Sequence, residues 1–137
     1  MAMTLVEVVV AMAITGLAIG GIINGYNYCT TSAQKAALTQ AAVARAMERI
    51  EETRSVKWDV TSWPTVDDLL TSNFTNKVVT LDMSGTGDVI TTASLQTEIS
   101  QISTNPSLKR IRVNCIWKFR GNQIITNSIE TFRAPDQ

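Results

Sequence analysis

The amino-acid sequence predicts an α+β protein in which the second half of one long N-terminal helix packs on a small antiparallel β-sheet. Three observations predict this fold class: an apolar tract over residues 3–24, a helix-forming segment over residues 30–55, and an alternation of apolar and polar residues from Lys77 onward. The chain has 137 residues, enough for one domain with a modest core. We expect residues 1–29 to stay exposed and residues 30–137 to form the globular domain.

The apolar tract predicts a helix that lies in a membrane or begins in one. Thr15 is the only clearly polar residue from Val8 to Ile23, and no charged residue lies between Val8 and Gln34. Over residues 3–24 the tract reaches the roughly 20 residues that span a bilayer. Its glycines, which are poor helix formers in water but common in membrane helices, are Gly16, Gly20 and Gly21.

The following segment, residues 30–55, predicts an amphipathic continuation of the same helix. It contains neither Gly nor Pro and is rich in Ala, Gln, Glu and Arg. Steps of three, four and one residues place six side chains on one face: Leu38, Ala42, Val43, Ala46, Met47 and Ile50. Charged side chains occupy much of the opposite face: Lys35, Arg45, Glu48, Arg49 and Glu52. The two segments together predict one helix of about 50 residues, roughly 75 Å long.

Trp58, Trp63 and Pro64 mark the end of this helix and open a loop. Within the loop, residues 65–70 are expected to form a short helical turn with Thr65 as its N-cap. The first strand is predicted over residues 77–83, with Val79, Leu81 and Met83 on one face.

Three further strands complete a predicted antiparallel sheet over residues 77–133. They cover residues 95–102, 108–119 and 123–132, and the segments SGTGD (84–88), NPS (105–107) and RGN (120–122) separate the strands. In residues 108–119 the apolar face consists of Ile111, Val113, Cys115, Trp117 and Phe119. This face needs a cover, and the amphipathic half of the helix is the available one.

The composition argues against several classes of function. Twelve Lys and Arg balance twelve Asp and Glu, so net charge does not favour nucleic acid as a partner. The chain has no histidine and only two cysteines, which disfavours a His/Cys metal site or a histidine-dependent triad. Asp67 and Asp68 are adjacent in sequence and do not normally face each other. We predict no enzyme, no catalytic residue, no cofactor and no small-molecule substrate.

The two cysteines, Cys29 and Cys115, leave two interpretations open. They are either two buried small hydrophobic residues or the partners of one disulfide in an oxidising compartment.

The segment MTLVEVVVAMAITG (residues 3–16) resembles the N-terminal signature of type IV prepilins and of type II secretion pseudopilins. In that family a prepilin peptidase cuts before a hydrophobic residue followed by Thr-Leu-Ile/Val-Glu and methylates the new amino terminus. The resemblance implies cleavage between Ala2 and Met3, with Glu7 as the family's glutamate and Gly16 at a common glycine position. It also implies a pilin-like fold.

The sequence departs from the family pattern at two places. Ala2 and Met1 stand where the family has a glycine and a short basic leader, so the leader has already been removed or cleavage lies elsewhere, such as before Met1. Asn24 stands where many pilins have a helix-kinking proline. Gly20, Gly21 and Gly25 are expected to supply flexibility there instead.

The resemblance implies a structural subunit of a type IV pilus-like filament that polymerises through its hydrophobic helix. Glu7 would pair with an N-terminal amine, of a neighbour or of its own chain, and so select the axial register. Two alternatives stay open: a type II secretion pseudopilin, and a minor tip pilin for adhesion or DNA uptake. Expected partners are copies of the chain, the bacterial inner membrane before assembly, prepilin peptidase and the assembly machinery. The expected final location is an extracellular filament or a periplasmic pseudopilus.

Two surface features have alternatives of their own. Asp82 and Asp88, on the glycine turn, loosely resemble the calcium loop of some pseudopilins, but two carboxylates are too few to predict a metal site. Arg110, Arg112, Lys118 and Arg120 form a basic strand face. We interpret it as a solvated or subunit-contacting surface, with a DNA-binding patch as the alternative.

Overall fold

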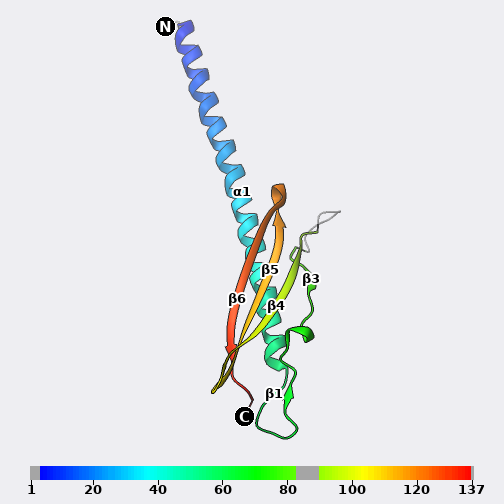
Figure 1. The fold of residues 1–137 in the computed structure, drawn as a ribbon. Coiled ribbons are helices and arrows are strands. Elements are labelled where there is room, and N and C mark those ends of the chain that lie inside the picture. Colours follow the sequence, from blue (N-terminus) through cyan, green and yellow to red (C-terminus); the bar gives the residue numbers. More distant parts are fainter. Residues whose placement is uncertain (1–3, 83–89, 137) are drawn as a thin grey trace. The chain divides into compact units, whose positions relative to one another are not determined.

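A computed structural model describes residues 4–82 and 90–136 and begins with one long helix. Helix α1 runs without interruption over Leu5–Ser55, 51 residues (Figure 1). The predicted continuity of the two segments is therefore confirmed. The last turn has side-chain donors for its carbonyls, because the Ser55 hydroxyl donates to the Glu52 carbonyl at 2.8 Å and the Arg133 guanidinium donates to the Thr53 carbonyl at 2.7 Å.

The chain separates into two compact units, residues 1–37 and residues 38–137. In the sequence, the change from the hydrophobic segment to the amphipathic segment predicts a division after residue 29 instead. The division falls later because Leu38 is the first apolar side chain of α1 that packs against the hydrophobic core.

The second unit contains the predicted antiparallel sheet. Its strands are β3 (Lys77–Thr80), β4 (Thr92–Thr104), β5 (Ser107–Phe119) and β6 (Gln123–Arg133), in the order β3-β4-β5-β6. Each strand pairs antiparallel with its neighbour. β4 is longer than the predicted 95–102, because its pairing with β5 extends from Ala93↔Trp117 to Thr104↔Ser107.

The turn after β5 is formed by the residues RGN (120–122), as predicted. A short 3-10 segment, η2 (Arg120–Asn122), joins β5 to β6. Gly121 has φ +70° and Asn122 has φ +63°. Glycine and asparagine adopt this left-handed conformation at the lowest cost, so this pair of residues suits a tight hairpin.

The loop after α1 differs from the prediction. β1 (Trp58–Asp59) and β2 (Val66–Asp67) form a two-stranded ribbon, and the short 3-10 helix η1 covers Thr71–Asn73. The helical turn predicted over residues 65–70 is therefore wrong. Pairing of Asp59 with Val66 holds this segment extended, which outweighs the local capping signal of Thr65.

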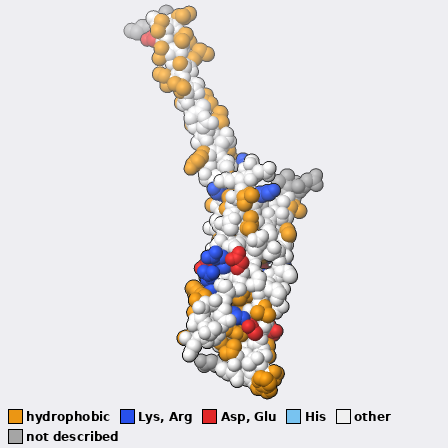
Figure 2. Space-filling model, in the orientation of Figure 1, with side chains coloured by type: hydrophobic (Ala, Val, Ile, Leu, Met, Phe, Trp, Pro, Cys, Tyr) orange, Lys and Arg blue, Asp and Glu red, His pale blue; other side chains and the backbone are white. Residues whose placement is uncertain are grey.

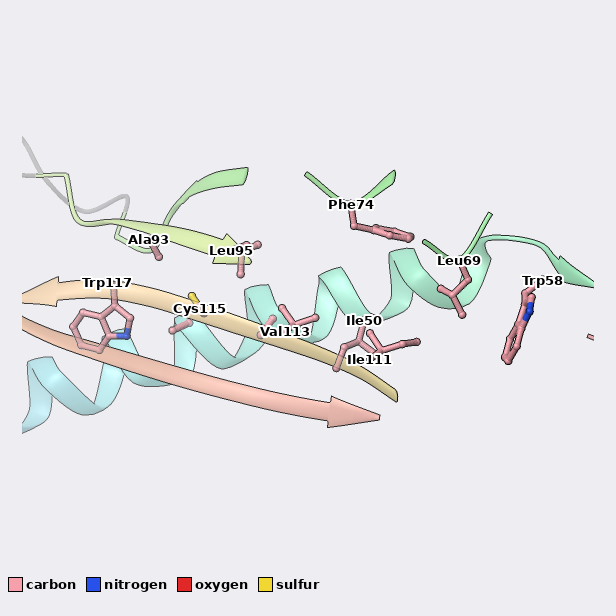
Figure 3. Packing of buried hydrophobic residues seen from close by; sticks show 12 residues of the cluster. Ile50, Trp58, Leu69, Phe74, Ala93, Leu95, Ile111, Val113, Cys115 and Trp117 are labelled. Carbon is pink, nitrogen blue, oxygen red and sulfur yellow. The ribbon is translucent and has the colours of Figure 1, made fainter. Parts of the chain in front are cut away.

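The core lies between α1 and one face of the sheet (Figure 3). Side chains alternate in and out along β5, so that Ile111, Val113 and Cys115 are fully buried and Trp117 is 1% exposed. The inward face predicted for this strand is thus confirmed. Other members of the core are Ala42, Ala46, Ile50, Trp58, Leu69, Phe74, Ala93 and Leu95.

The buried face of α1 is rotated relative to the predicted one. Ala42, Ala46 and Ile50 are buried as expected, but Val43 is 37% and Met47 53% exposed. Arg49 and Thr53 are buried in their place. The placement of Val43 and Met47 in the core is therefore wrong, and so is the placement of Arg49 on the solvated face.

Arg49 is buried because every part of its guanidinium has a partner. Nε donates to the Thr97 hydroxyl at 3.1 Å, Nη1 to Glu52 at 2.5 Å and Nη2 to the Thr75 carbonyl at 2.7 Å. The guanidinium carbon lies 5.2 Å from the centre of the Phe74 ring. A buried charge is tolerated only with such compensation, so Arg49 joins α1 to β4 and to the segment before β3.

Lys109, near the start of β5, is a second buried cation that joins separate elements. Its ammonium is buried, donates to both carboxylate oxygens of Asp67 at 2.6 and 2.7 Å, and donates to the Leu69 carbonyl at 2.8 Å. It also lies 4.8 Å from the Trp58 ring centre. The β1–β2 ribbon is therefore attached to the main sheet through one cation. The alternation along β5 contains this signal, since Lys109 shares the register of Ile111.

The C-terminal segment attaches to the same ribbon. The Trp58 N–H donates to Asp136 at 2.9 Å, and the Asp136 N–H donates to the Trp58 carbonyl at 2.7 Å. The Arg133 guanidinium also donates to the Asp136 carboxylate, at 2.7 Å. Donation to the carboxylate by the Trp58 N–H, and next by Arg133, lowers the pKa of Asp136. The pKa of Asp59 is held far below its usual range by Ser62 and then by Thr61, whose N–H groups and hydroxyls donate to its carboxylate.

Candidate functional site

The candidate functional surface is the apolar first unit. From Leu5 to Tyr28, thirteen large hydrophobic side chains are each at least 42% exposed. They are Leu5, Val6, Val8, Val9, Val10, Met12, Ile14, Leu17, Ile19, Ile22, Ile23, Tyr26 and Tyr28. Hydrophobic side chains likewise dominate the first turns of α1 in Figure 2. An exposed apolar surface of this extent marks a membrane or protein contact.

Three threonine hydroxyls of this unit are satisfied within the helix. The Thr15 hydroxyl donates to the Ala11 carbonyl, and the Thr30 and Thr31 hydroxyls donate to the Tyr26 and Asn27 carbonyls, each at 2.8 Å. A hydroxyl bonded to the preceding turn costs little to remove from water. These three hydroxyls are therefore compatible with an apolar environment.

By length and composition, α1 can cross a membrane. It is the one helix of the described residues that meets this test, and the apolar stretch that meets it has no buried residue. The length and the apolar character predicted for residues 3–24 are thus confirmed for the part of the tract that begins at Thr4.

Glu7, the single carboxylate of the tract, has a local structural role. α1 begins at Leu5, so Thr4 is the N-cap and Glu7 is the third helical residue. The Thr4 N–H and the Thr4 hydroxyl both donate to Glu7 Oε2 at 3.0 Å. In return the Glu7 N–H donates to the Thr4 hydroxyl at 3.4 Å. This reciprocal pair is a capping box.

The hydrogen bonds of the capping box offset part of the free-energy cost of placing a carboxylate in the apolar tract. A negative charge in the first turn is also favoured by the partial positive charge of the helix N-terminus. The sequence signal for this capping box is the spacing Thr4-x-x-Glu7. Both bonds from Thr4 end on Oε2, so a cation can approach Oε1 without displacing Thr4.

Of the other residues predicted to act in processing or assembly, the structure describes the glycines but not Ala2 and Met3. Met3 and Ala2 lie outside the described residues. Gly16, Gly20 and Gly21 are helical within the uninterrupted α1, and a Cβ added at any of them would meet no atom within 4 Å. Helix flexibility at these glycines stays a prediction for the assembled state.

The two cysteines lie in different environments, and both are free thiols. Cys115 is fully buried in the core, and burial raises the pKa of its thiol. Cys29 is exposed on α1. The structure therefore supports the small hydrophobic interpretation for Cys115, but not for Cys29, and the alternative Cys29–Cys115 disulfide is not formed.

The remaining candidate groups show no metal site within the part of the chain that the structure describes. Asp88 lies outside the described residues, and no group of three potential metal ligands is found over residues 4–82 and 90–136. On the basic face, Arg112 of β5 forms an ion pair with Glu130 of β6, which reduces the positive charge available to a polyanion.

Comparison of the chain with protein-family models, with curated proteins and with solved structures found no match.

Proposed function

We propose that this chain is a structural subunit of a type IV pilus-like filament that polymerises through its first unit. The carrying observation is the exposed apolar surface of α1 with a single carboxylate, Glu7, in its first turn. The resemblance of residues 3–16 to the prepilin signature supports the same proposal. Before assembly the apolar helix would reside in the bacterial inner membrane, and prepilin peptidase and an assembly machinery would act on it.

Hydrophobic contact supplies the cohesion of such a filament. Burying one Val, Leu or Ile side chain contributes about 1.5–3 kcal/mol. Burial of only half of the thirteen exposed side chains would therefore contribute on the order of 10 kcal/mol for each subunit. Such contact is non-directional, so a separate feature must select the stagger between neighbouring helices.

Glu7 is the group suited to select that stagger. Inside a bundle of apolar helices its ionised carboxylate requires a cationic partner. The N-terminal amine of a neighbouring subunit is a partner of the right charge, and Oε1 faces no competition from the Thr4 bonds, which end on Oε2. Registers that leave Glu7 unpaired would be disfavoured.

A pseudopilin of a type II secretion system is the alternative, because it uses the same helix in a short periplasmic filament. A minor tip subunit for adhesion or DNA uptake is the third candidate. Long surface fibres that contain this chain would favour the pilus. A low abundance in sheared filaments would favour the tip subunit.

Three substitutions separate the charge of Glu7 from its capping role. Glu7→Gln keeps a side-chain acceptor for the Thr4 N–H but removes the charge, whereas Thr4→Ala removes the capping hydroxyl and keeps the charge. Glu7→Ala removes both the acceptor and the charge. We expect Glu7→Gln and Glu7→Ala to reduce filament yield at least tenfold, measured by shearing and electron microscopy. Thr4→Ala should reduce it much less.

The opposite ranking would contradict the proposed pairing. If Glu7→Gln forms filaments in normal amounts while Thr4→Ala does not, the carboxylate serves the helix end alone. Membrane levels of each variant control for expression and insertion.

A further inference from the structure

One edge of the sheet is formed by β6, which is the last strand in the order β3-β4-β5-β6 (Figure 1). β6 has 11 residues, Gln123–Arg133. Its pairing with β5 is regular, without a register shift, from Phe119↔Gln123 to Lys109↔Arg133. The backbone donors and acceptors on its outer side are therefore arranged as a template for another strand.

β6 lacks the features that usually protect an edge. Protected edges are short, bulged, or contain Lys or Pro. The other edge of this sheet, β3, has four residues and begins with Lys77. β4 carries a register shift between Gln101 and Ser103. β6 contains neither Lys nor Pro, and its charged residues are Glu130 and Arg133.

Two apolar side chains of β6 point away from the core. Ile124 is 64% exposed and Phe132 59% exposed, whereas Ile125 and Ile129, which alternate with them, pack against the core. Ile124 and Phe132 lie four residues before and four residues after Ser128, the central residue of the strand. On the outward face of β6, an apolar side chain therefore lies at the same distance on each side of Ser128.

We propose that β6 pairs antiparallel with β6 of a second copy of this chain, on a two-fold axis through Ser128. In this register Ile124 faces Phe132 of the second copy twice, Thr126 faces Glu130, and no like charges are opposed. Directly opposed apolar and aromatic side chains stabilise a strand pair by about 0.2–1 kcal/mol each.

Neighbouring registers are less favourable. A two-fold axis at Glu130 would place two carboxylates opposite each other and Phe132 opposite Ser128. An axis at Thr126 would place Phe132 opposite Arg120. A shift by a single residue would set outward side chains against inward ones.

The pair forms one continuous eight-stranded sheet, with both α1 segments over residues 38–55 on the same face and running in opposite directions. Subunits of one filament point the same way. The β6 pair thus joins two free chains, or two filaments that lie side by side in opposite directions. It requires only the second unit and stands independently of the proposed filament role.

Disulfide cross-linking of the full chain in mild non-ionic detergent tests the register. In a Cys29→Ser background, which removes the exposed native thiol, Ser128→Cys places two thiols directly opposite each other. Opposed Cα atoms of an antiparallel pair are about 4.5–5.5 Å apart, within the range that a disulfide bridges. Thr126→Cys is the matched control, exposed on the same face of the same strand. Its two copies would lie roughly 13 Å apart.

We expect Ser128→Cys to form covalent dimers at least tenfold faster than Thr126→Cys under a mild oxidant. Adding Ile124→Glu, which places a carboxylate against Phe132, should reduce that rate at least tenfold. Equal rates for the two cysteines, a monomeric Ser128→Cys protein, or insensitivity to Ile124→Glu would overturn the proposal.

Discussion

Asp67→Ala is expected to destabilise the second unit more than Lys109→Met, although both substitutions break the same ion pair. The asymmetry follows from burial, because the Lys109 side chain is 6% exposed and the Asp67 side chain 43% exposed. Without Asp67, the Lys109 ammonium remains buried and keeps its contacts with the Leu69 carbonyl and the Trp58 ring. Removing one partner of a buried pair in this way costs about 3–5 kcal/mol.

Lys109→Met leaves a different residue behind. The methionine chain replaces most of the apolar stem, and Asp67 regains water because it is half-exposed. The main loss is the hydrogen bond to the buried Leu69 carbonyl, which costs about 1–3 kcal/mol. We therefore expect a difference of roughly 2 kcal/mol between the two variants.

The assay is urea unfolding of the full chain in mild non-ionic detergent, followed by tryptophan fluorescence. Asp68→Ala is the matched control, because Asp68 is the neighbouring exposed carboxylate, and its free energy of unfolding should change by less than about 0.5 kcal/mol. If Lys109→Met lowers the free energy of unfolding as much as Asp67→Ala or more, burial does not decide which partner of the ion pair matters.

Three further predictions concern the first unit, the thiols and acid. Removing residues 1–27 should yield a water-soluble fragment that, by sedimentation at micromolar concentration, forms nothing larger than the β6-paired dimer, because the truncation removes most of the exposed apolar surface; a fragment that stays in the membrane fraction would contradict the role given to the first unit. A maleimide should label Cys29 in the folded chain and Cys115 only after unfolding, and labelling of both at equal rates would show that the core opens readily. The lowered pKa values of Asp59 and Asp136 stabilise the fold above the ordinary carboxyl pKa, so this stability should be lost as pH falls below about 4. The difference between the urea midpoints at pH 7 and pH 3 measures this loss. Asp59→Asn should make the difference smaller, and an unchanged difference would refute the stabilising role of Asp59.

The order of elements could be read from local patterns in the sequence. The continuity of α1 follows from the absence of Pro and from helix-forming residues over 30–55, and β5 follows from strict alternation over 108–119. These signals are strong because period and composition act on every residue of a long segment. The loop over residues 58–74 has no such period. Its ribbon was missed because it depends on pairing between Trp58–Asp59 and Val66–Asp67.

The candidate assembly surface was also predictable in part. Exposure of the apolar tract follows from its composition, since it is apolar on all sides and the predicted sheet is too small to cover it. The capping box of Thr4 and Glu7 could have been recognised from its spacing. The self-complementary register of β6 could not, because it requires knowing that β6 is an edge and which of its side chains face outward.

Local period and composition specify the long helix, the division between an apolar and an amphipathic part, and the alternating strands that make a sheet. Which face of α1 is buried, and where cations enter the interior, depends instead on contacts between residues that are distant in the chain. The sequence pattern places Arg49 on the solvated face, yet Arg49 and Lys109 are both buried because distant partners, Thr97 and Asp67, complete their hydrogen bonds. Such compensation joins residues far apart in the chain, and it exists only once the fold has brought them together.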